Sequence, residues 1–204
     1  MAGVNAKKVF IGLADQSTTV GALARGTVLT TIPADYSAAA TAISSFTSSG
    51  YISEDGATLT TNKSTVAIRE WNRAAVRRVL EDFDGTVTCN LIQLDEEGAK
   101  QCFGASNVTK VAANSTHGEQ LKIAMGATLD TPQAWALKLK DGDMKAILLV
   151  PNGQVTSGIN ITFSATEAIE LPIEISANDD GTGNSVTRYQ RIEFDKGCSR
   201  RRCV

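Results

Sequence analysis

The sequence predicts a mainly β protein: an antiparallel β-sandwich or barrel with one short flanking α-helix and extended arms or loops. Three observations support this fold class. Apolar and polar residues alternate in several segments, such as residues 169–175, which is the pattern of a half-buried strand. An Asp-Gly pair at 141–142 separates two such segments, as in a β-hairpin. Helical spacing with capping residues occurs near residues 95–103.

Length and charge limit the organisation of the chain. Its 204 residues can bury a substantial core, and we expect a single domain over residues 1–204. Within it we expect an N-terminal strand and a long arm or loop in residues 1–50, the sandwich core in residues 51–194, and a flexible basic tail in residues 195–204. The formal net charge of −2 argues against tight binding of nucleic acid, which needs a clustered basic surface.

The segment of residues 14–50 is predicted to be the arm. It is rich in Ala, Ser and Thr, contains Pro33 and several glycines, and has few large apolar residues. A long segment with so little core pattern is usually a functional loop or an arm. Residues 37–46 are compatible with a helical turn or two.

Residues 50–71 begin with Tyr51, the acidic pair Glu54 and Asp55, and Gly56, and continue through small hydroxyl residues to Trp71. Adjacent side chains on an extended chain point to opposite faces, so the two carboxylates make a poor acid–base pair. We predict a loop over residues 56–65, anchored at its ends by Tyr51 and Trp71.

A strand–helix unit follows. Asp84-Gly85 predicts a turn between strands at residues 76–81 and 86–94. The helix, at about residues 95–103, is capped by Asp95 and stopped by Gly104, and its first turn is acidic.

Five further strands are predicted. Four show alternation and lie at residues 121–125, 135–140, 159–163 and 169–175, and the fifth is the apolar run at residues 146–150, which follows 135–140 across the Asp141-Gly142 turn. Pro151, Asn152 and Gly153 are predicted to close the 146–150 strand. Pro172 lacks an N–H group and therefore indicates a sheet edge or a bulge.

The sequence shows no pattern of an active site or a cofactor site. It has no GxSxG, P-loop, HExxH or GxGxxG motif, and His117, its only histidine, lies in a polar turn-like stretch. The acidic glycine-rich stretch at residues 179–183 does not have EF-hand spacing, so a solvated turn is favoured over a calcium site. We therefore expect no enzyme activity, no cofactor and no metal.

The cysteines and the terminal segments lead to similar expectations. Cys89 and Cys102 are expected to be buried free thiols. Cys198 and Cys203 flank three arginines. Their spacing permits a disulfide between them, which would be unusual in a reducing compartment. The N-terminal segment has no long apolar run, and no segment has the roughly 18 apolar residues of a membrane span, so we expect no secretory signal and no membrane contact.

Several segments together resemble the major tail tube proteins of long-tailed bacteriophages (siphoviruses). They are GYISEDG with the downstream Trp71, GTVTCNLIQLDEEGAKQCFG, KDGDMKAILLVPNGQV and FSATEAIELPIEISA. Their order and spacing carry the resemblance, which covers residues 50–194. The C-terminal GCSRRRCV matches no motif of that family.

The resemblance implies a structural virion protein. Six copies close into a ring, and rings stack into a tube that conducts the genome, with strands of each subunit lining the channel. The implied partners are other copies of the chain, the tape measure protein, the tail terminator, distal tail or baseplate proteins, and DNA in transit. Assembly takes place in the host cytoplasm.

The resemblance also suggests which residues meet other subunits. We predict an interface that comprises Tyr51, Glu54, Asp55, Gly56, Thr58, Thr60, Asn62 and Lys63. Because a conduit must not hold DNA, we predict a neutral to acidic channel face that uses Glu170 or Glu174. The alternatives are another phage virion β-protein, such as a tail terminator or head decoration protein, and a related tube of a bacterial secretion machine.

Overall fold

The computed structural model describes residues 9–126, 129–156, 158–179 and 191–195. Its strands are β1 (Leu13–Ala14), β2 (Leu23–Gly26), β3 (Thr47–Ser48), β4 (Ile52–Arg69), β5 (Ala75–Leu91), β6 (Val108–Val111), β7 (Gln120–Ile123), β8 (Gln133–Asp141), β9 (Met144–Val155), β10 (Leu171–Ala177) and β11 (Arg191–Asp195). The α-helices are α1 (Tyr36–Ala42) and α2 (Glu96–Phe103), and short 3-10 helices span Ile43–Ser45 and Ala105–Asn107. The predicted mainly β fold is confirmed, with two short α-helices in the described part rather than the single one expected.

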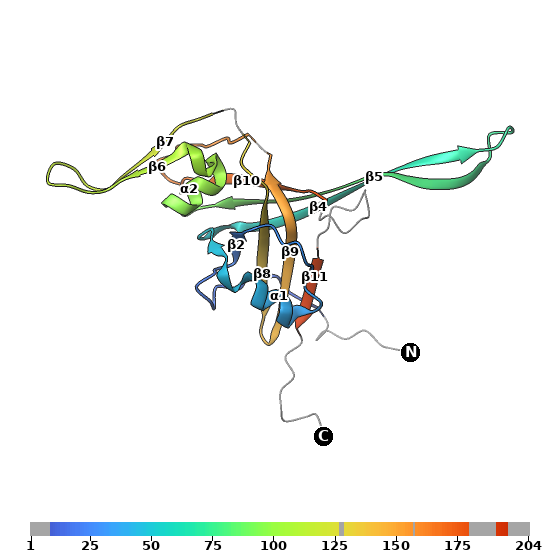
Figure 1. Cartoon of the computed structure of the whole chain (residues 1–204), viewed down its shortest axis with the longest axis horizontal. Helices are drawn as coiled ribbons and strands as arrows, with labels where there is room; N and C mark the ends of the chain where they lie inside the picture. The colour runs from blue at the N-terminus through green and yellow to red at the C-terminus, as the bar shows by residue number, and fades with distance from the viewer. Residues whose placement is uncertain (1–8, 127–128, 157, 180–190, 196–204) are drawn as a thin grey trace, which may run out of the picture.

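The described strands form one large antiparallel sheet and one small one. The large sheet has the order β3-β2-β8-β9-β10-β5-β4, with β1 added beside β8 and β11 beside β9, and β6 and β7 pair separately. In Figure 1 the β8–β9 part of this sheet runs steeply across the β10-β5-β4 part, so that the two parts enclose a core between them.

Strand β9 makes the connection between the two parts. Its first half pairs with β11 and its last residues, from Gly153 to Val155, pair with β10. Gly153 is needed at this change of partner, because a Cβ there would come within 2.9 Å of both Ile175 and Trp135. The predicted turn at Pro151-Asn152-Gly153 is therefore wrong, since these residues continue β9.

The main core lies between the two parts of the sheet. It collects alternate side chains from several strands and one cysteine from α2, namely Leu23, Val87, Cys89, Leu91, Cys102, Trp135, Leu137, Leu148, Val150, Leu171, Ile173, Ile175 and Ala177. Leu171, Ile173 and Ile175 are nearly fully buried, whereas the intervening residues of β10 are half-buried. The predicted alternation at residues 169–175 is thus confirmed over β10.

A second core lies on the other face of β2, β8 and β9. Ala24, Ala134 and Ala136 are fully buried there against α1 and the turn that follows it. Small side chains let the helix approach the sheet closely. The predicted arm at residues 14–50 is therefore corrected: these residues form β1, β2, α1 and β3, and much of the segment packs into the molecule.

The local capping and hairpin predictions have mixed outcomes. Asp95 caps α2 by accepting a 2.7 Å hydrogen bond from the Gly98 N–H group, and the Asp141-Gly142 hairpin forms between β8 and β9, both as predicted. The Asp84-Gly85 turn is wrong, because Gly85 is buried inside β5 and pairs with Thr61 of β4.

Two predicted strands need correction. Residues 159–163 form no strand, although Ile159 and Ile161 still pack against the main core. Around residues 121–125, strand β7 ends at Ile123, and Met125 lies beyond it with 83% of its surface exposed. Pro172 behaves as predicted, since β9 pairs with β10 only from Ile175 onwards and leaves Pro172 at an edge.

Candidate assembly surface

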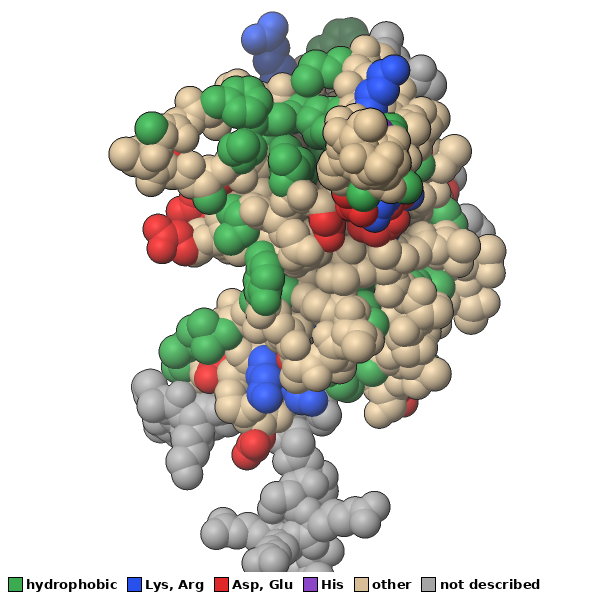
Figure 2. Space-filling model, turned by 90° about the vertical axis from the view of Figure 1, so that its left-hand side faces the viewer, with side chains coloured by type: hydrophobic (Ala, Val, Ile, Leu, Met, Phe, Trp, Pro, Cys, Tyr) green, Lys and Arg blue, Asp and Glu red, His purple; other side chains and the backbone are tan. Residues whose placement is uncertain are grey.

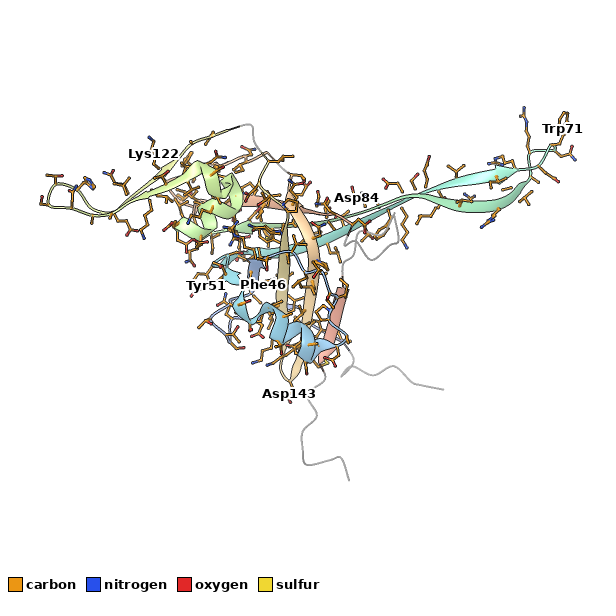
Figure 3. The ribbon with its side chains drawn as sticks, in the orientation of Figure 1. Phe46, Tyr51, Trp71, Asp84, Lys122 and Asp143 are labelled. Carbon is orange, nitrogen blue, oxygen red and sulfur yellow. The ribbon has the colours of Figure 1, made fainter. Side chains whose placement is uncertain are left out.

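The most prominent feature of the molecule is the hairpin of β4 and β5, which extends far beyond the body (Figure 1). Strand β4 has 18 residues and β5 has 17. Figure 3 places Tyr51 and Trp71 at opposite ends of this hairpin, with Asp84 between them. The predicted loop at residues 56–65 is therefore corrected to a strand, and Trp71 lies at the hairpin tip rather than at the entrance to the sandwich.

The amino-acid sequence favours these two strands. Thr, Val and Ile are frequent between residues 57 and 69, and such β-branched side chains suit a pleated surface. The tip is closed by a 3.0 Å hydrogen bond from the Glu70 N–H group to the Ala74 carbonyl oxygen. Arg73 there has a φ of 67°, a conformation that side chains other than glycine seldom adopt.

Irregular pairing divides the hairpin into regions. Near its base, Ile52 pairs with Leu91 and Ala57 pairs with Cys89, so residues 53–56 form a wide bulge. Further out, Ser64 pairs with Asp82 and Thr65 with Leu80, which makes Glu81 the extra residue of a second bulge. We call residues 65–80, beyond this second bulge, the distal hairpin.

The part before the second bulge has one polar face. Because its other face carries the buried residues of β5, such as Val87 and Cys89, the polar face points away from the core. The polar face comprises Thr58, Thr60 and Asn62 of β4, Asp84, Thr86, Thr88 and Asn90 of β5, and Glu174 and Ser176 of β10. These positions include carboxylates but no lysine or arginine.

Cross-strand register makes this polar face continuous. Thr88 lies between Thr58 on β4 and Glu174 on β10, and Thr86 lies between Thr60 and Ser176 in the same way. Cross-strand neighbours of this kind are close enough to interact. The polar face therefore runs across three adjacent strands.

The distal hairpin has a different surface. Along the same side of β4, the series Thr58, Thr60, Asn62 and Ser64 continues as Val66 and Ile68. The exposed apolar side chains here are Val66 at 47%, Ile68 at 52%, Trp71 at 99%, Val76 at 69%, Val79 at 40% and Leu80 at 48%. Several large apolar side chains exposed close together on one segment make the distal hairpin a candidate interaction site.

After the exposed apolar side chains, the second candidate contact surface is the outer edge of β4, whose backbone hydrogen-bonding groups face no neighbouring strand in the described residues. Within the described residues, β4 pairs only with β5 and stands last in the strand order of the sheet. A long edge of this kind offers a row of backbone N–H and C=O groups to another strand. Pairing with a strand of a second copy would satisfy them.

The residues predicted to form the interface are dispersed over this hairpin. Tyr51 is 56% exposed just before β4, and Glu54, Asp55 and Gly56 lie in the bulge at its base. Thr58, Thr60 and Asn62 lie together on the polar face. Lys63 points to the other face, where its Nζ atom is 5.6 Å from the centre of the Phe83 ring.

The exposed residues of the distal hairpin were missed by the sequence-based prediction. A signal was present, because residues 75–80 place two arginines between four apolar residues, without a glycine, proline, asparagine or aspartate that would indicate a turn. The false turn at Asp84-Gly85 divided one long strand into two short ones, which hid how far the hairpin reaches.

The opposite end of the molecule is built around α2. Lys100 lies 2.6 Å from Glu96, and Lys110 of β6 lies 3.0 Å from Glu119 and 3.7 Å from Glu96, so ion pairs connect α2 to the β6–β7 hairpin. These contacts raise the pKa of both lysines and lower the pKa of Glu96.

Arg25 of β2 also contacts this end. The side chain is 9% exposed, and its guanidinium lies 3.6 Å from Glu97 and 3.7 Å from Asp130 and donates a 3.1 Å hydrogen bond to Gln133. These contacts position α2 against the sheet.

The chemistry of an enzyme site does not assemble in the described residues. The described residues contain no group of three or more His, Cys, Asp or Glu side chains that could hold a metal ion. Cys89 and Cys102 are buried free cysteines, and burial raises the pKa of each thiol to about 12. His117 is half-buried and lies in a polar turn with Asn114, and the polar turn is as predicted.

No helix in the described part of the chain is long and apolar enough to cross a membrane. Cys198, Cys203 and the basic C-terminal segment lie outside the described residues, as do residues 180–183 of the acidic glycine-rich stretch. Asn152 donates a 2.6 Å hydrogen bond to the Asp179 carbonyl oxygen, which places that residue beside the end of β9.

The hairpin, the unpaired edge and the polar face all point to self-assembly, and a family model agrees with them. The model of a family described as phage tail tube protein matches residues 14–193. The chain belongs to the phage tail tube protein family. No curated protein matches the chain.

Membership of this family fixes the general role of the protein. A tail tube protein is a structural component of the phage tail and not an enzyme, and it lies in the tail of the virion. Family membership also implies that copies of the chain assemble into a tube. The prominent hairpin and its edge are thus surfaces of an assembling subunit.

Proposed function

We propose that this tail tube protein forms hexameric rings that stack into the tail tube of a siphovirus and conduct its genome at ejection. The observation that supports this proposal is the polar face on β4, β5 and β10, together with the open edge of β4. A sheet continued from subunit to subunit satisfies that edge, and a heterologous contact of this kind closes into a ring when its rotation permits.

In this arrangement the polar face lines the channel. Hydroxyl, amide and carboxylate groups without lysine or arginine give a surface that does not hold the phosphates of passing DNA. Glu174 lies within this face, and Glu170 lies just before β10, where it accepts a 2.8 Å hydrogen bond from Asn90. Both carboxylates fit the prediction of a neutral to acidic channel.

The remaining partners follow from the same role. The tube surrounds the tape measure protein during assembly in the host cytoplasm, and its ends meet the tail terminator and the distal tail or baseplate proteins. The interface with neighbouring subunits includes Glu54, Asp55 and Gly56 in the bulge, the Tyr51 side chain before it, and residues 58–63 along β4.

Electron microscopy of the purified protein tests this proposal. We expect hollow tubes with six-fold symmetry in cross-section and with the β10-β5-β4 sheet lining the channel. A protein that stays monomeric at high concentration would contradict the proposal, and rings that never elongate would indicate a tail terminator instead. A channel lined by lysine and arginine would overturn the assignment of the polar face.

A further inference from the structure

The distal hairpin is basic as well as apolar. Residues 65–80 contain four arginines and one glutamate, a net charge of +3 in a chain whose net charge is −2. Arg77 lies opposite Ile68, and Arg78 lies opposite Ala67, so arginines are placed on both faces between the exposed apolar side chains. A partner for this segment must therefore offer acidic groups beside apolar ones.

A groove of about 670 Å³ with that chemistry lies at the other end of the same two strands. We call it the acidic groove. It is lined by residues that include Ser53, Glu54, Asn90, Glu167, Glu170 and Pro172, and no lysine or arginine is among its lining residues. Ile92, which also lines it, is 39% exposed and supplies apolar surface.

Ser53 supplies an independent sign of a missing contact. This residue lines the acidic groove and is only 7% exposed, yet its hydroxyl has no hydrogen-bond partner among the described residues. A buried polar group without a partner costs free energy, so such groups are normally satisfied. A ligand seated in the groove can satisfy the Ser53 hydroxyl.

The two surfaces cannot meet within one molecule. The acidic groove lies where β4 begins and β5 ends, whereas the distal hairpin lies where β4 ends and β5 begins. Figure 2 looks onto the end of the molecule away from the hairpin tip, where hydrophobic, acidic and basic side chains are all exposed. Two complementary surfaces at opposite ends of one chain produce a head-to-tail, propagating contact between copies.

We propose that the distal hairpin of one copy binds in the acidic groove of the next copy along the tube. Arg77 and Arg78 then pair with Glu54 and Glu167, because a guanidinium forms strong forked hydrogen bonds with carboxylates. The apolar side chains around the arginines cover the apolar part of the groove. This inference rests on the proposed stacking of rings and names the contact that links one ring to the next.

The docking has a consequence for the channel. Glu170 lines the acidic groove, so a bound hairpin covers it and places it at the junction between rings. Glu174 is not among the groove-lining residues, and it stays on the open polar face. Of the two carboxylates predicted to face the channel, Glu174 is then the one that DNA passes.

Charge exchange between the two surfaces tests the proposal. One variant carries Arg77→Glu and Arg78→Glu, a second carries Glu54→Lys and Glu167→Lys, and a third carries all four changes. We expect each double variant to reduce the mass of pelleted tubes by about tenfold or more and the fourfold variant to recover most of it. All four side chains are exposed, so circular dichroism should show folded protein with an unchanged melting temperature.

The control carries Asp143→Lys, which makes the same kind of charge change at an exposed site outside the groove and outside the ion pairs of α2. We expect this control to form tubes of normal length. If it blocks growth as strongly as the groove variant, or if the fourfold variant fails to recover tubes, the proposed contact is wrong. Failure of the unmodified protein to form tubes would instead contradict the proposed function itself.

Discussion

Aliphatic side chains of similar kind lie in opposite environments in this molecule. Ile175 is fully buried between the two parts of the sheet, whereas Val76 near the hairpin tip is 69% exposed. Burial of the first stabilises the monomer, and the second contributes only when another molecule covers it. Alanine substitutions can therefore separate folding from assembly.

We predict that Ile175→Ala lowers the free energy of unfolding of the monomer by about 2–5 kcal/mol, because it removes core contacts and leaves a cavity. Val76→Ala should change it by less than about 0.5 kcal/mol while reducing tube yield. Urea unfolding monitored by circular dichroism measures the first effect, and sedimentation measures the second. Equal losses of stability in the two variants would contradict the burial pattern.

The thiols of Cys89 and Cys102 give a second prediction at this scale. Since burial raises the pKa of both to about 12, they stay protonated at pH 8 and shielded from reagents. We expect iodoacetamide to label neither cysteine in the folded protein and both in urea, as read by mass spectrometry of peptides. Rapid labelling of Cys89 in the native protein would mean that the core opens readily.

At the scale of elements, local signals predicted local structure well. Asp95 caps α2 and Asp141-Gly142 turns the chain between β8 and β9, because both depend on a few neighbouring residues. Asp84-Gly85 has the same turn composition, yet long-range pairing with β4 keeps it extended. Turn propensity alone could not reveal that competition.

The segment at residues 14–50 was misjudged for a different reason. Half of its apolar residues are alanine, which carries little hydrophobic signal in a sequence. In the structure Ala24 and Ala39 are almost fully buried because close packing of α1 on the sheet requires small side chains. The exposed residues of the distal hairpin escaped prediction because the false turn at Asp84-Gly85 hid the length of β5.

Removal of the distal hairpin tests whether it is an independent element. Connecting Ser64 to Glu81 by a two-residue Asn-Gly turn deletes residues 65–80, which contribute nothing to either core. We expect the truncated monomer to fold with an unchanged melting temperature but to form no tubes in electron micrographs. Tubes of normal length from this variant would show that the distal hairpin is dispensable for assembly.

At the scale of the whole molecule, the proposed channel lining by the polar face predicts a tube that does not hold DNA. A Glu174→Lys variant places six new positive charges around each proposed ring. We expect its tubes to assemble normally but to retain DNA at low salt and to release it as ionic strength rises, because bound counterions compete for the phosphates. Co-sedimentation of labelled duplex DNA with the tubes measures this, and unmodified tubes should retain none.

The outer edge of β4 has a further consequence for how copies recognise one another. Its sequence around residues 58–61 repeats small hydroxyl side chains, so a partner strand that slips by two residues again meets nearly the same surface. Backbone pairing along this edge is thus strong but undiscriminating. The contacts that fix the register of the partner strand must then lie at the two ends of β4, in the bulge at residues 53–56 and in the basic, apolar tip.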